Sequence, residues 1–412
     1  MPPKSVYRRQ GGHAALAATL ALVAAPAIGA PITESQAVER ALAQPEFSAL
    51  GAANREEAQA RIAGIRRFDN PEASVSREQL SGAGRSETEW QAGVTQPVDL
   101  SGKRAALRAA ARAEAGAVDA DISRRRQERT AEVRRAFAGC AAATEKVRVS
   151  NTFIGRLREA ERIVTARTRA GDTAGYDLRR LRVEARTAEA QGQLTAGEVA
   201  AECASLSRLS GEPDARPAEP IAAIALRATP TSPPEARPDI LARERRVLAA
   251  SQQVRAAQRG RLPEIAVGLG YKRVTADEGS AGGPVVSLGA RIPLFDNGGA
   301  AIREARARQR AREAELGLAR REAGAAVAVA EARTSAALSA ARAAQAAAGD
   351  AARLGPIAEA AYNGGESGVV ELVDAYRTAR DAELEIIELL ERAARARVDL
   401  ELAQGSAADA GI

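Results

Sequence analysis

Gly171-Asp172-Thr173-Ala174-Gly175-Tyr176-Asp177-Leu178 is a short stretch whose pattern occurs twice in this 412-residue chain. The second copy is Gly365-Glu366-Ser367-Gly368-Val369-Val370-Glu371-Leu372, 194 residues further along. Both copies consist of glycine, an acid, serine or threonine, a small residue, two variable residues, an acid and leucine. Because glycine permits the tight backbone turn that ends a helix, each copy predicts a turn between two helices.

Two further pairs of stretches match in the same order. Pro71-Glu72 matches Pro263-Glu264 at an offset of 192 residues, and residues 96–102 match 292–298 at an offset of 196. Three matches at nearly one offset indicate an internal duplication. Each half is then expected to contain a first helix, two strands, a very long helix, the glycine turn and a return helix. The first helices are predicted at 32–66 and 236–260.

The duplication divides the chain into five predicted parts. They are a signal peptide (1–27), a first repeat (28–212), a proline-rich connector (213–237), a second repeat (238–404) and a flexible C-terminal tail (405–412).

The N-terminus has the pattern of a secretory signal. Lys4, Arg8 and Arg9 precede an apolar run at 14–23, and Ala25-Pro26-Ala27 is a typical cleavage site. The alternative is an N-terminal membrane anchor, for which the apolar run is short. No later stretch has about 18 consecutive apolar residues, so the exported chain either stays in the periplasm or crosses a membrane as β-strands.

The two long helices are predicted at 103–170 and 299–362. Alanine, arginine, glutamate and leucine dominate them, and these residues favour helix. A helix of about 65 residues measures ~100 Å, which is too long for the interior of a globular domain. The apolar positions are mostly alanine, which buries little area per contact, so a single hairpin would be marginal. We therefore expect neighbouring subunits to cover these helices.

Two pairs of strand-like runs precede the long helices. The runs at 265–271 and 286–292 alternate between apolar and small or polar residues, and 275–283 between them is predicted to be a loop. Weaker runs lie at 73–79 and 88–98. One apolar face suits a strand that faces lipid. The alternative is an ordinary hairpin packed on helices.

The composition argues against an enzyme and against nucleic-acid binding. The 59 basic and 53 acidic residues are interspersed and aromatic residues make up 3%, which is typical of a solvated helical surface. The single histidine falls in the signal peptide, so the usual general base and histidine-ligated zinc are absent. We expect no catalytic residues and no metal site.

Cys140 and Cys203 are the only cysteines, and the residue midway between them falls on the Gly171 turn. Two antiparallel helices joined at that turn would bring both cysteines to the same height. An oxidising compartment then favours a disulfide, although the helix faces are not known from sequence. The alternative is a pair of buried thiols.

Three stretches suggest a family. They are Gln96-Pro97-Val98-Asp99-Leu100-Ser101-Gly102-Lys103-Arg104, Ile292-Pro293-Leu294-Phe295-Asp296 and Leu209-Ser210-Gly211-Glu212-Pro213. All three resemble stretches of TolC-like outer-membrane efflux proteins. With the signal and the two-fold repeat, the resemblance covers nearly all of the exported chain. It is closest to the CzcC-like heavy-metal efflux branch.

The resemblance implies a mainly α protein with a small β part. Long helical hairpins would form a helical barrel across the periplasm. Four antiparallel strands per subunit would contribute to a trimeric twelve-stranded barrel in the outer membrane. The implied partners are a periplasmic adaptor and an inner-membrane pump. Because the pump supplies the energy, the resemblance implies that this subunit needs no cofactor.

The resemblance also implies roles for the two glycine turns. The tips that contact the adaptor would be Gly171, Asp172, Thr173 and Ala174 of the first turn, and Gly365, Glu366, Ser367 and Gly368 of the second. Glu371 and Asp374 share a helix face and would form rings of negative charge that attract cations in a trimer; a solvated acidic face is the alternative. Tyr362 and Asp177 match positions near the closed gate. Ser367 stands where some members have a basic residue, so the same gate lock is not expected.

Two other functions compete with an efflux channel that exports ions or small molecules. A periplasmic coiled-coil scaffold would not need the alternation in the strands. An exported hydrolase would need a catalytic pair that the sequence does not contain. Metal cations, drugs and other small molecules all remain candidate substrates.

Overall fold

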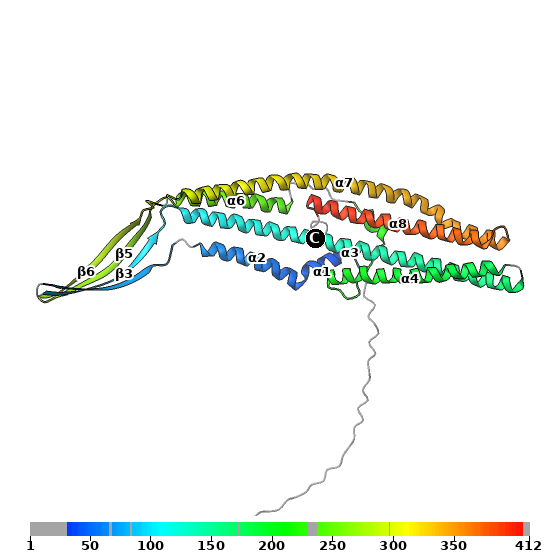
Figure 1. Ribbon diagram of the computed structural model, residues 1–412, viewed down its shortest axis with the longest axis horizontal. Coiled ribbons are helices and arrows are strands. Elements are labelled where there is room, and N and C mark those ends of the chain that lie inside the picture. Colours follow the sequence, from blue (N-terminus) through cyan, green and yellow to red (C-terminus); the bar gives the residue numbers. More distant parts are fainter. Residues whose placement is uncertain are drawn as a thin grey trace, which may run out of the picture.

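The computed structural model describes residues 31–65, 68–82, 85–171, 174–228, 237–295 and 297–406, so the expected signal peptide (1–27) lies outside it. The described chain is an elongated rod (Figure 1). A β-sheet forms one end, helices run along the remainder, and two helical turns form the opposite end. None of the helices in the described ranges combines the length and apolar character that a bilayer span requires.

Two very long helices form the body of the rod. Helix α3 spans Lys103–Ala170 and helix α7 spans Gly299–Gly364, close to the predicted ranges. A left-handed glycine lies at each of their four ends, where a side chain would be strained. Helix α7 is arched (Figure 1), and Pro356 in its last third removes one backbone hydrogen bond.

Each long helix packs against its return helix. Helix α4 (Gly175–Ser210) lies along α3, and α8 (Val369–Gln404) lies along α7. Helix α6 (Pro238–Arg259) fills the remaining length between α3 and α7. Gly405 and Ser406, assigned to the C-terminal tail by sequence, close α8 through backbone hydrogen bonds. Residues 407–412 lie outside the described part of the chain.

The helix predicted at 32–66 is two helices, α1 (Glu34–Ala43) and α2 (Pro45–Gly64). The break falls at Gln44, whose backbone is extended, because the residue before a proline is disfavoured in helix.

Near the middle of the rod, strand β1 (Pro31–Ile32) pairs with β4 (Arg216–Pro217). The predicted connector (213–237) thus contains β4 and the short helix α5 (Ile221–Ala225), while 229–236 lie outside the description.

The sheet is antiparallel, with the strand order β2-β3-β5-β6. Its strands are β2 (Glu72–Gly82), β3 (Arg85–Val98), β5 (Glu264–Ala276) and β6 (Gly279–Arg291). The predicted loop at 275–283 is wrong, because only Asp277 and Glu278 separate β5 from β6. The ladder continues through glycine and polar residues there, since its hydrogen bonds use the backbone alone.

One face of the sheet is apolar across all four strands. Directly paired residues share a face, and Ala73, Val94, Leu269 and Val286 form one continuous row. The opposite face carries glycine and small or polar residues, such as Gly268 beside Ser287. Eight large side chains of the apolar face are at least 42% exposed in the single chain: Val75, Trp90, Val94, Val267, Leu269, Tyr271, Val286 and Leu288.

A buried ionic network joins α1, α3 and α8 at mid-length. Glu34, Arg134, Arg397 and Glu401 are at most 7% exposed. Both arginines donate to Glu401, Arg397 at 2.6 Å, and Glu34 Oε1 lies 3.6 Å from Arg397. Removing one partner of such a network leaves a buried charge uncompensated, which is strongly destabilising.

A disulfide joins Cys140 of α3 to Cys203 of α4, with Cα atoms 4.7 Å apart. Both cysteines lie in the mid-length apolar cluster with Phe137 and Leu206. The bond closes a loop that contains the Gly171 turn between α3 and α4. It therefore reduces the conformational freedom of the unfolded chain.

We expect the double variant Cys140→Ala/Cys203→Ala to lose about 2–4 kcal/mol of unfolding free energy, mainly because the unfolded chain is less constrained. Thermal unfolding in detergent, with and without reductant, measures this loss. Reductant should lower the unfolding temperature of the unaltered protein and leave that of the variant unchanged. Equal responses to reductant would contradict the disulfide.

Candidate functional site

The two helical turns at the end of the rod are built alike. Gly171 and Gly365 have φ values of 87° and 78°, and each donates its N–H back to carbonyls in the last turn of its long helix. Glu366 N–H also reaches Ala361 O at 2.9 Å, which closes the end of α7. The predicted tip residues Gly171, Ala174, Gly365, Glu366 and Gly368 are exposed, and Ser367 is half-buried. Asp172 and Thr173 lie outside the described residues.

An apolar cluster holds the two hairpins together behind the turns. It contains Leu157 and Val164 of α3, Leu181 of α4, and Leu372 and Tyr376 of α8. All four helices of the tip region contribute, since Tyr362 of α7 belongs to it as well. We call this group the tip cluster. It makes the two turns one packed unit within the subunit.

Tyr362, predicted to lie at a gate, is 5% exposed and packs inside the tip cluster. The Arg167 guanidinium stacks on its ring, 4.7 Å from the centroid, and donates to its carbonyl oxygen at 3.2 Å. Arg167 also donates to Asn363 O at 3.4 Å. A cation at these last carbonyls of α7 is favourable because the helix C-terminus carries partial negative charge. Arg167 thus ties the first hairpin to the end of the second.

Glu371 and Asp374 are both exposed on the first turns of α8, as their spacing predicts. A Glu371 carboxylate oxygen accepts the N–H of Gly368 at 3.1 Å, so this residue caps the helix. Asp177, at the start of α4, is half-buried, and its N–H donates to Ala174 O at 3.1 Å. Within one chain these carboxylates therefore stand near the turns on two different hairpins.

Sequence reasoning missed two polar contacts of the tip region. Arg377 of α8 donates to Glu184 of α4 at 2.6 Å, and this hydrogen bond raises the pKa of Arg377. Tyr376 donates its hydroxyl proton to Glu359 at 2.8 Å. Glu184 and Arg377 are 193 residues apart, and Arg167 and Tyr362 are 195 apart. Both separations are close to the offset between the two repeats, so equivalent positions of the two hairpins lie at the same level along the rod. The offset could therefore have suggested the Glu184–Arg377 and Arg167–Tyr362 contacts.

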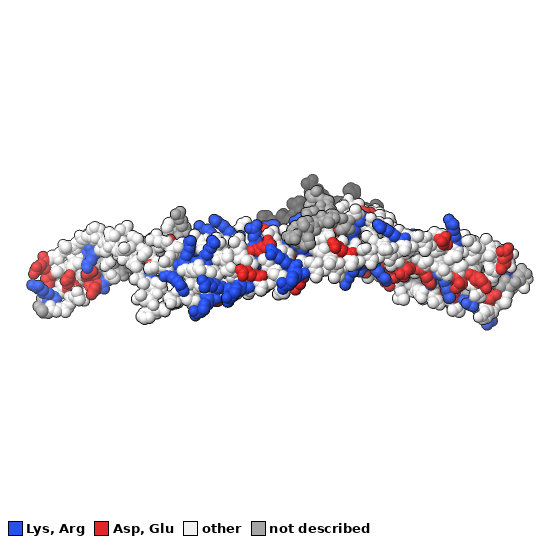
Figure 2. All heavy atoms as spheres, turned by 90° about the horizontal axis from the view of Figure 1, so that it is seen from above, with Lys and Arg blue, Asp and Glu red and all other residues white. Residues whose placement is uncertain are grey.

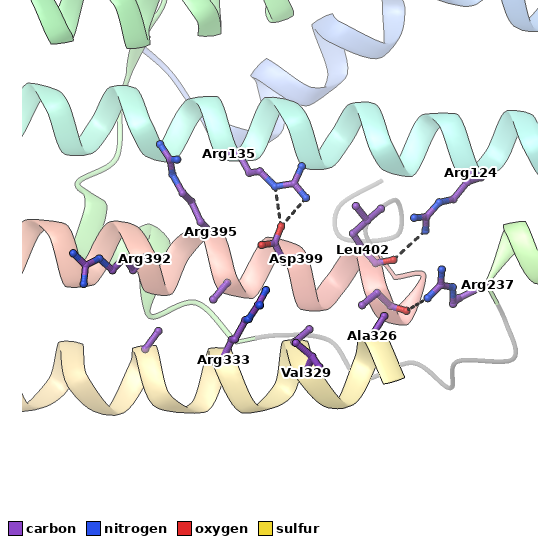
Figure 3. Close-up of a pocket in the computed structure, with 14 residues that line it drawn as sticks. Arg124, Arg135, Arg237, Ala326, Val329, Arg333, Arg392, Arg395, Asp399 and Leu402 are labelled. Atoms are coloured by element: carbon purple, nitrogen blue, oxygen red, sulfur yellow. Dashed lines mark hydrogen bonds and ion pairs between the residues drawn. The ribbon is translucent and has the colours of Figure 1, made fainter. Parts of the chain in front are cut away.

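A cavity of about 640 Å³ lies at mid-length where α3, α7 and α8 meet (Figure 3). It is lined by alanines and by six arginines, among them Arg124, Arg135 and Arg237. Arg124 and Arg237 donate to Leu402 O and Ala403 O, and Arg135 pairs with Asp399. These arginines therefore satisfy the C-terminal carbonyls and a carboxylate of α8. The described residues contain no cluster of three or more metal-ligating side chains.

The chain matches the family model described as outer membrane efflux protein over residues 13–212 and 234–406. It is 29% identical over 299 residues to the nickel-cobalt-cadmium resistance protein NccC of Alcaligenes xylosoxydans xylosoxydans. That match covers 69% of this chain and 66% of NccC, just under two thirds of the relative.

Solved structures share the fold. A membrane protein from Pseudomonas aeruginosa superposes with a TM-score of 0.72 at 21% identity, covering 92% of this chain and 93% of that one. CusC gives the same TM-score and coverages at 18% identity. The outer membrane channel CmeC of Campylobacter jejuni gives 0.70 at 16% identity, covering 91% of this chain and 86% of that one. The predicted mainly helical fold with a small antiparallel sheet is thereby confirmed.

We expect Tyr376→Phe to change how stability depends on pH. Burial and the hydrogen bond to Glu359 raise the pKa of Tyr376 above its usual value of 10.0. The unfolded chain therefore releases the phenol proton near pH 10 while the folded chain retains it, so the stabilisation is present below that pH and is lost above it. Near pH 7 the variant should lose about 1 kcal/mol of unfolding free energy, the contribution of one hydrogen bond.

Unfolding temperatures measured from neutral to alkaline pH test this expectation. The difference between the unaltered protein and Tyr376→Phe should shrink above about pH 10. Tyr176→Phe is the matched control, since Tyr176 is 69% exposed. Parallel profiles for the protein and Tyr376→Phe would contradict it.

Proposed function

The chain belongs to the outer membrane efflux protein family, and we propose that three copies form the outer-membrane channel of an efflux assembly driven by an inner-membrane pump. The observation that carries the proposal is a sheet with one apolar face at the end of two helices of ~100 Å. The sheet would stand in the outer membrane, and the helices would span the periplasm.

The open edges of the sheet support an assembly of several copies. Among the described residues, strands β2 and β6 each pair on one side only, so their outer edges present N–H and C=O groups that no described strand pairs. In a bilayer such groups must be paired, which closure into a barrel achieves. Pairing β2 of one copy with β6 of the next would give a closed barrel of twelve strands from three copies. The apolar face would then point toward lipid.

The long helices support the same assembly. The described faces of α7 are largely exposed, and the buried positions of this helix are mostly alanine, such as Ala319, Ala323 and Ala330. Such faces bury little apolar area within one chain, so neighbouring copies would add the packing that each lacks. The exposed turns at Gly171 and Gly365 would remain available to a periplasmic adaptor.

We propose divalent metal cations as the cargo, because the relative NccC is named for resistance to nickel, cobalt and cadmium. Methionine and histidine are almost absent from the chain, so its walls would not hold such ions tightly. Weak binding suits a conduit, since cargo must leave as readily as it enters. Glu371, Asp374 and Asp177 would line the narrow end, where the exposed Glu371 and Asp374 would attract cations. Tyr362 would support this end from inside the tip cluster.

A tryptophan scan tests whether the sheet lies in a bilayer. In the alternative, a periplasmic coiled-coil scaffold, the sheet would stay outside the membrane. In a Trp90→Phe background, Leu288→Trp places the only tryptophan on the apolar face, and Ser287→Trp places it on the opposite face. With brominated phospholipids in the bilayer, fluorescence at position 288 should be strongly quenched and that at 287 little. Equal quenching, or release of the protein from outer membranes by a salt wash, would favour the scaffold.

We expect Glu371→Gln/Asp374→Asn to lower the cation preference of the channel roughly twofold, because three copies would lose six negative charges. The amide that replaces the Glu371 carboxylate retains an oxygen that can accept the Gly368 N–H, so the helix cap is preserved. Reversal potentials in planar bilayers measure the preference. The control Glu39→Gln/Glu198→Gln removes two exposed carboxylates elsewhere. Unchanged preference in the tip variant would rule out this gate.

A further inference from the structure

The four passages between sheet and helices all carry large apolar side chains exposed to solvent. They are Phe68 before β2, Leu100 after β3, Leu262 before β5, and Leu294 and Phe295 after β6. Leu100 is 74% exposed, Leu294 76% and Phe295 103%, values among the highest for large apolar residues of the chain. All four passages join the same end of the sheet to the helices (Figure 1), so these side chains lie at one level of the rod. We call this level the junction.

Among the helices next to the junction, α7 is strongly basic. The first fourteen residues of α7 contain five arginines and one acid, Glu304, whereas residues 369–391 of α8, at the tip end, contain seven acids and two arginines. Figure 2 shows an uncharged zone beyond the charged end of the sheet, followed by dense basic patches over the helices. Arg261, Arg303, Arg306 and Arg310 are exposed, and none pairs with a described carboxylate.

A cavity of about 300 Å³ opens at the junction. Lys103, Arg104 and Arg259 line it together with the apolar Leu107 and Leu262. Arg104 pairs with Asp69, and Asp99 accepts backbone N–H groups at the start of α3. Glu264 pairs with Arg291 at 3.4 Å. Each carboxylate that lines the cavity therefore already has an ion-pair or hydrogen-bond partner, and Lys103 and Arg259 have no carboxylate partner among the described residues.

We propose that the junction binds the headgroups of anionic phospholipids in the periplasmic leaflet of the outer membrane, an inference that rests on the proposed membrane placement of the sheet. The exposed apolar side chains would enter the acyl boundary, and the arginines and Lys103 would bind lipid phosphates. The opposite end of the sheet is nearly balanced in charge, because the exposed acids Glu78, Glu87, Asp277 and Glu278 lie beside the exposed Arg77, Arg85 and Arg273. Anionic headgroups would therefore be attracted more strongly at the junction than at the opposite end. This difference would fix how deeply, and which way round, the sheet sits.

The test measures lipid preference around the assembled protein. The full-length protein is reconstituted in phosphatidylcholine bilayers, and spin-labelled phosphatidylglycerol and phosphatidylcholine report the relative association constant of the two headgroups. The variant is Arg261→Gln/Arg303→Gln/Arg306→Gln. The control Arg169→Gln/Arg179→Gln/Arg186→Gln removes the same charge from exposed arginines near the tips.

We expect the unaltered protein and the tip control to prefer phosphatidylglycerol by about fivefold, the effect of one basic residue at a lipid surface. The junction variant keeps Lys103, Arg259 and Arg310, so its preference should fall well below that of the unaltered protein without vanishing, and added salt should reduce the preference because exposed charges are screened. An undiminished preference in the junction variant, or equal loss in the tip control, would overturn the proposal. So would an unchanged lipid preference with altered ion selectivity in planar bilayers, which would place these arginines along the conduit.

The tryptophan scan of the sheet separates this inference from the proposed function. Quenching of Leu288→Trp together with no headgroup preference would refute only the junction site. Absence of quenching at that position would refute the membrane placement itself.

Discussion

A shortage of apolar area on two helices of ~100 Å governs how this chain packs. The contact faces of these helices are built mainly from alanine, which lets helices approach closely but removes little area from water per residue. Each long helix must therefore find partners along its whole length. Within the chain, α4 and α6 cover α3, and α6 and α8 cover α7. The large exposed surface that remains is the physical reason to expect further copies.

Larger apolar residues and buried ionic networks are concentrated at two levels of the rod, where they hold neighbouring helices in register. At mid-length, the Cys140–Cys203 disulfide and the buried ions Glu34, Arg134, Arg397 and Glu401 join elements that are distant in sequence. At the turns, the tip cluster performs the same task with leucine, valine and tyrosine. Arg167 adds a polar link between the hairpins. From mid-length toward the sheet the helices are held mostly by alanine contacts, such as those of Ala117, Ala120 and Ala242.

The sign of the charge differs between the two ends of the helical part of the rod. The start of α7 beside the sheet is basic and the start of α8 is acidic, so a conduit built from this chain would present different fields to a membrane and to passing cations. On the proposed function, this difference would orient the subunit and favour positively charged cargo.

Local patterns in the amino-acid sequence were enough to establish the duplication, the two long helices, both glycine turns and the alternating strands. Helix and strand periodicity, and the need for glycine at a left-handed turn, are properties of neighbouring residues. The same local rules place a break at Gln44, which precedes Pro45, and they mark Pro356 as a weak point within the helix expected over 299–362. The extent of β5 and β6, the facing of Cys140 and Cys203, the burial of Tyr362 and the contacts of Arg167 emerged from the folded chain alone. Strand length depends on a backbone ladder that side chains do not encode, and the other features depend on which helix faces meet, which is a property of packing between residues far apart in the chain.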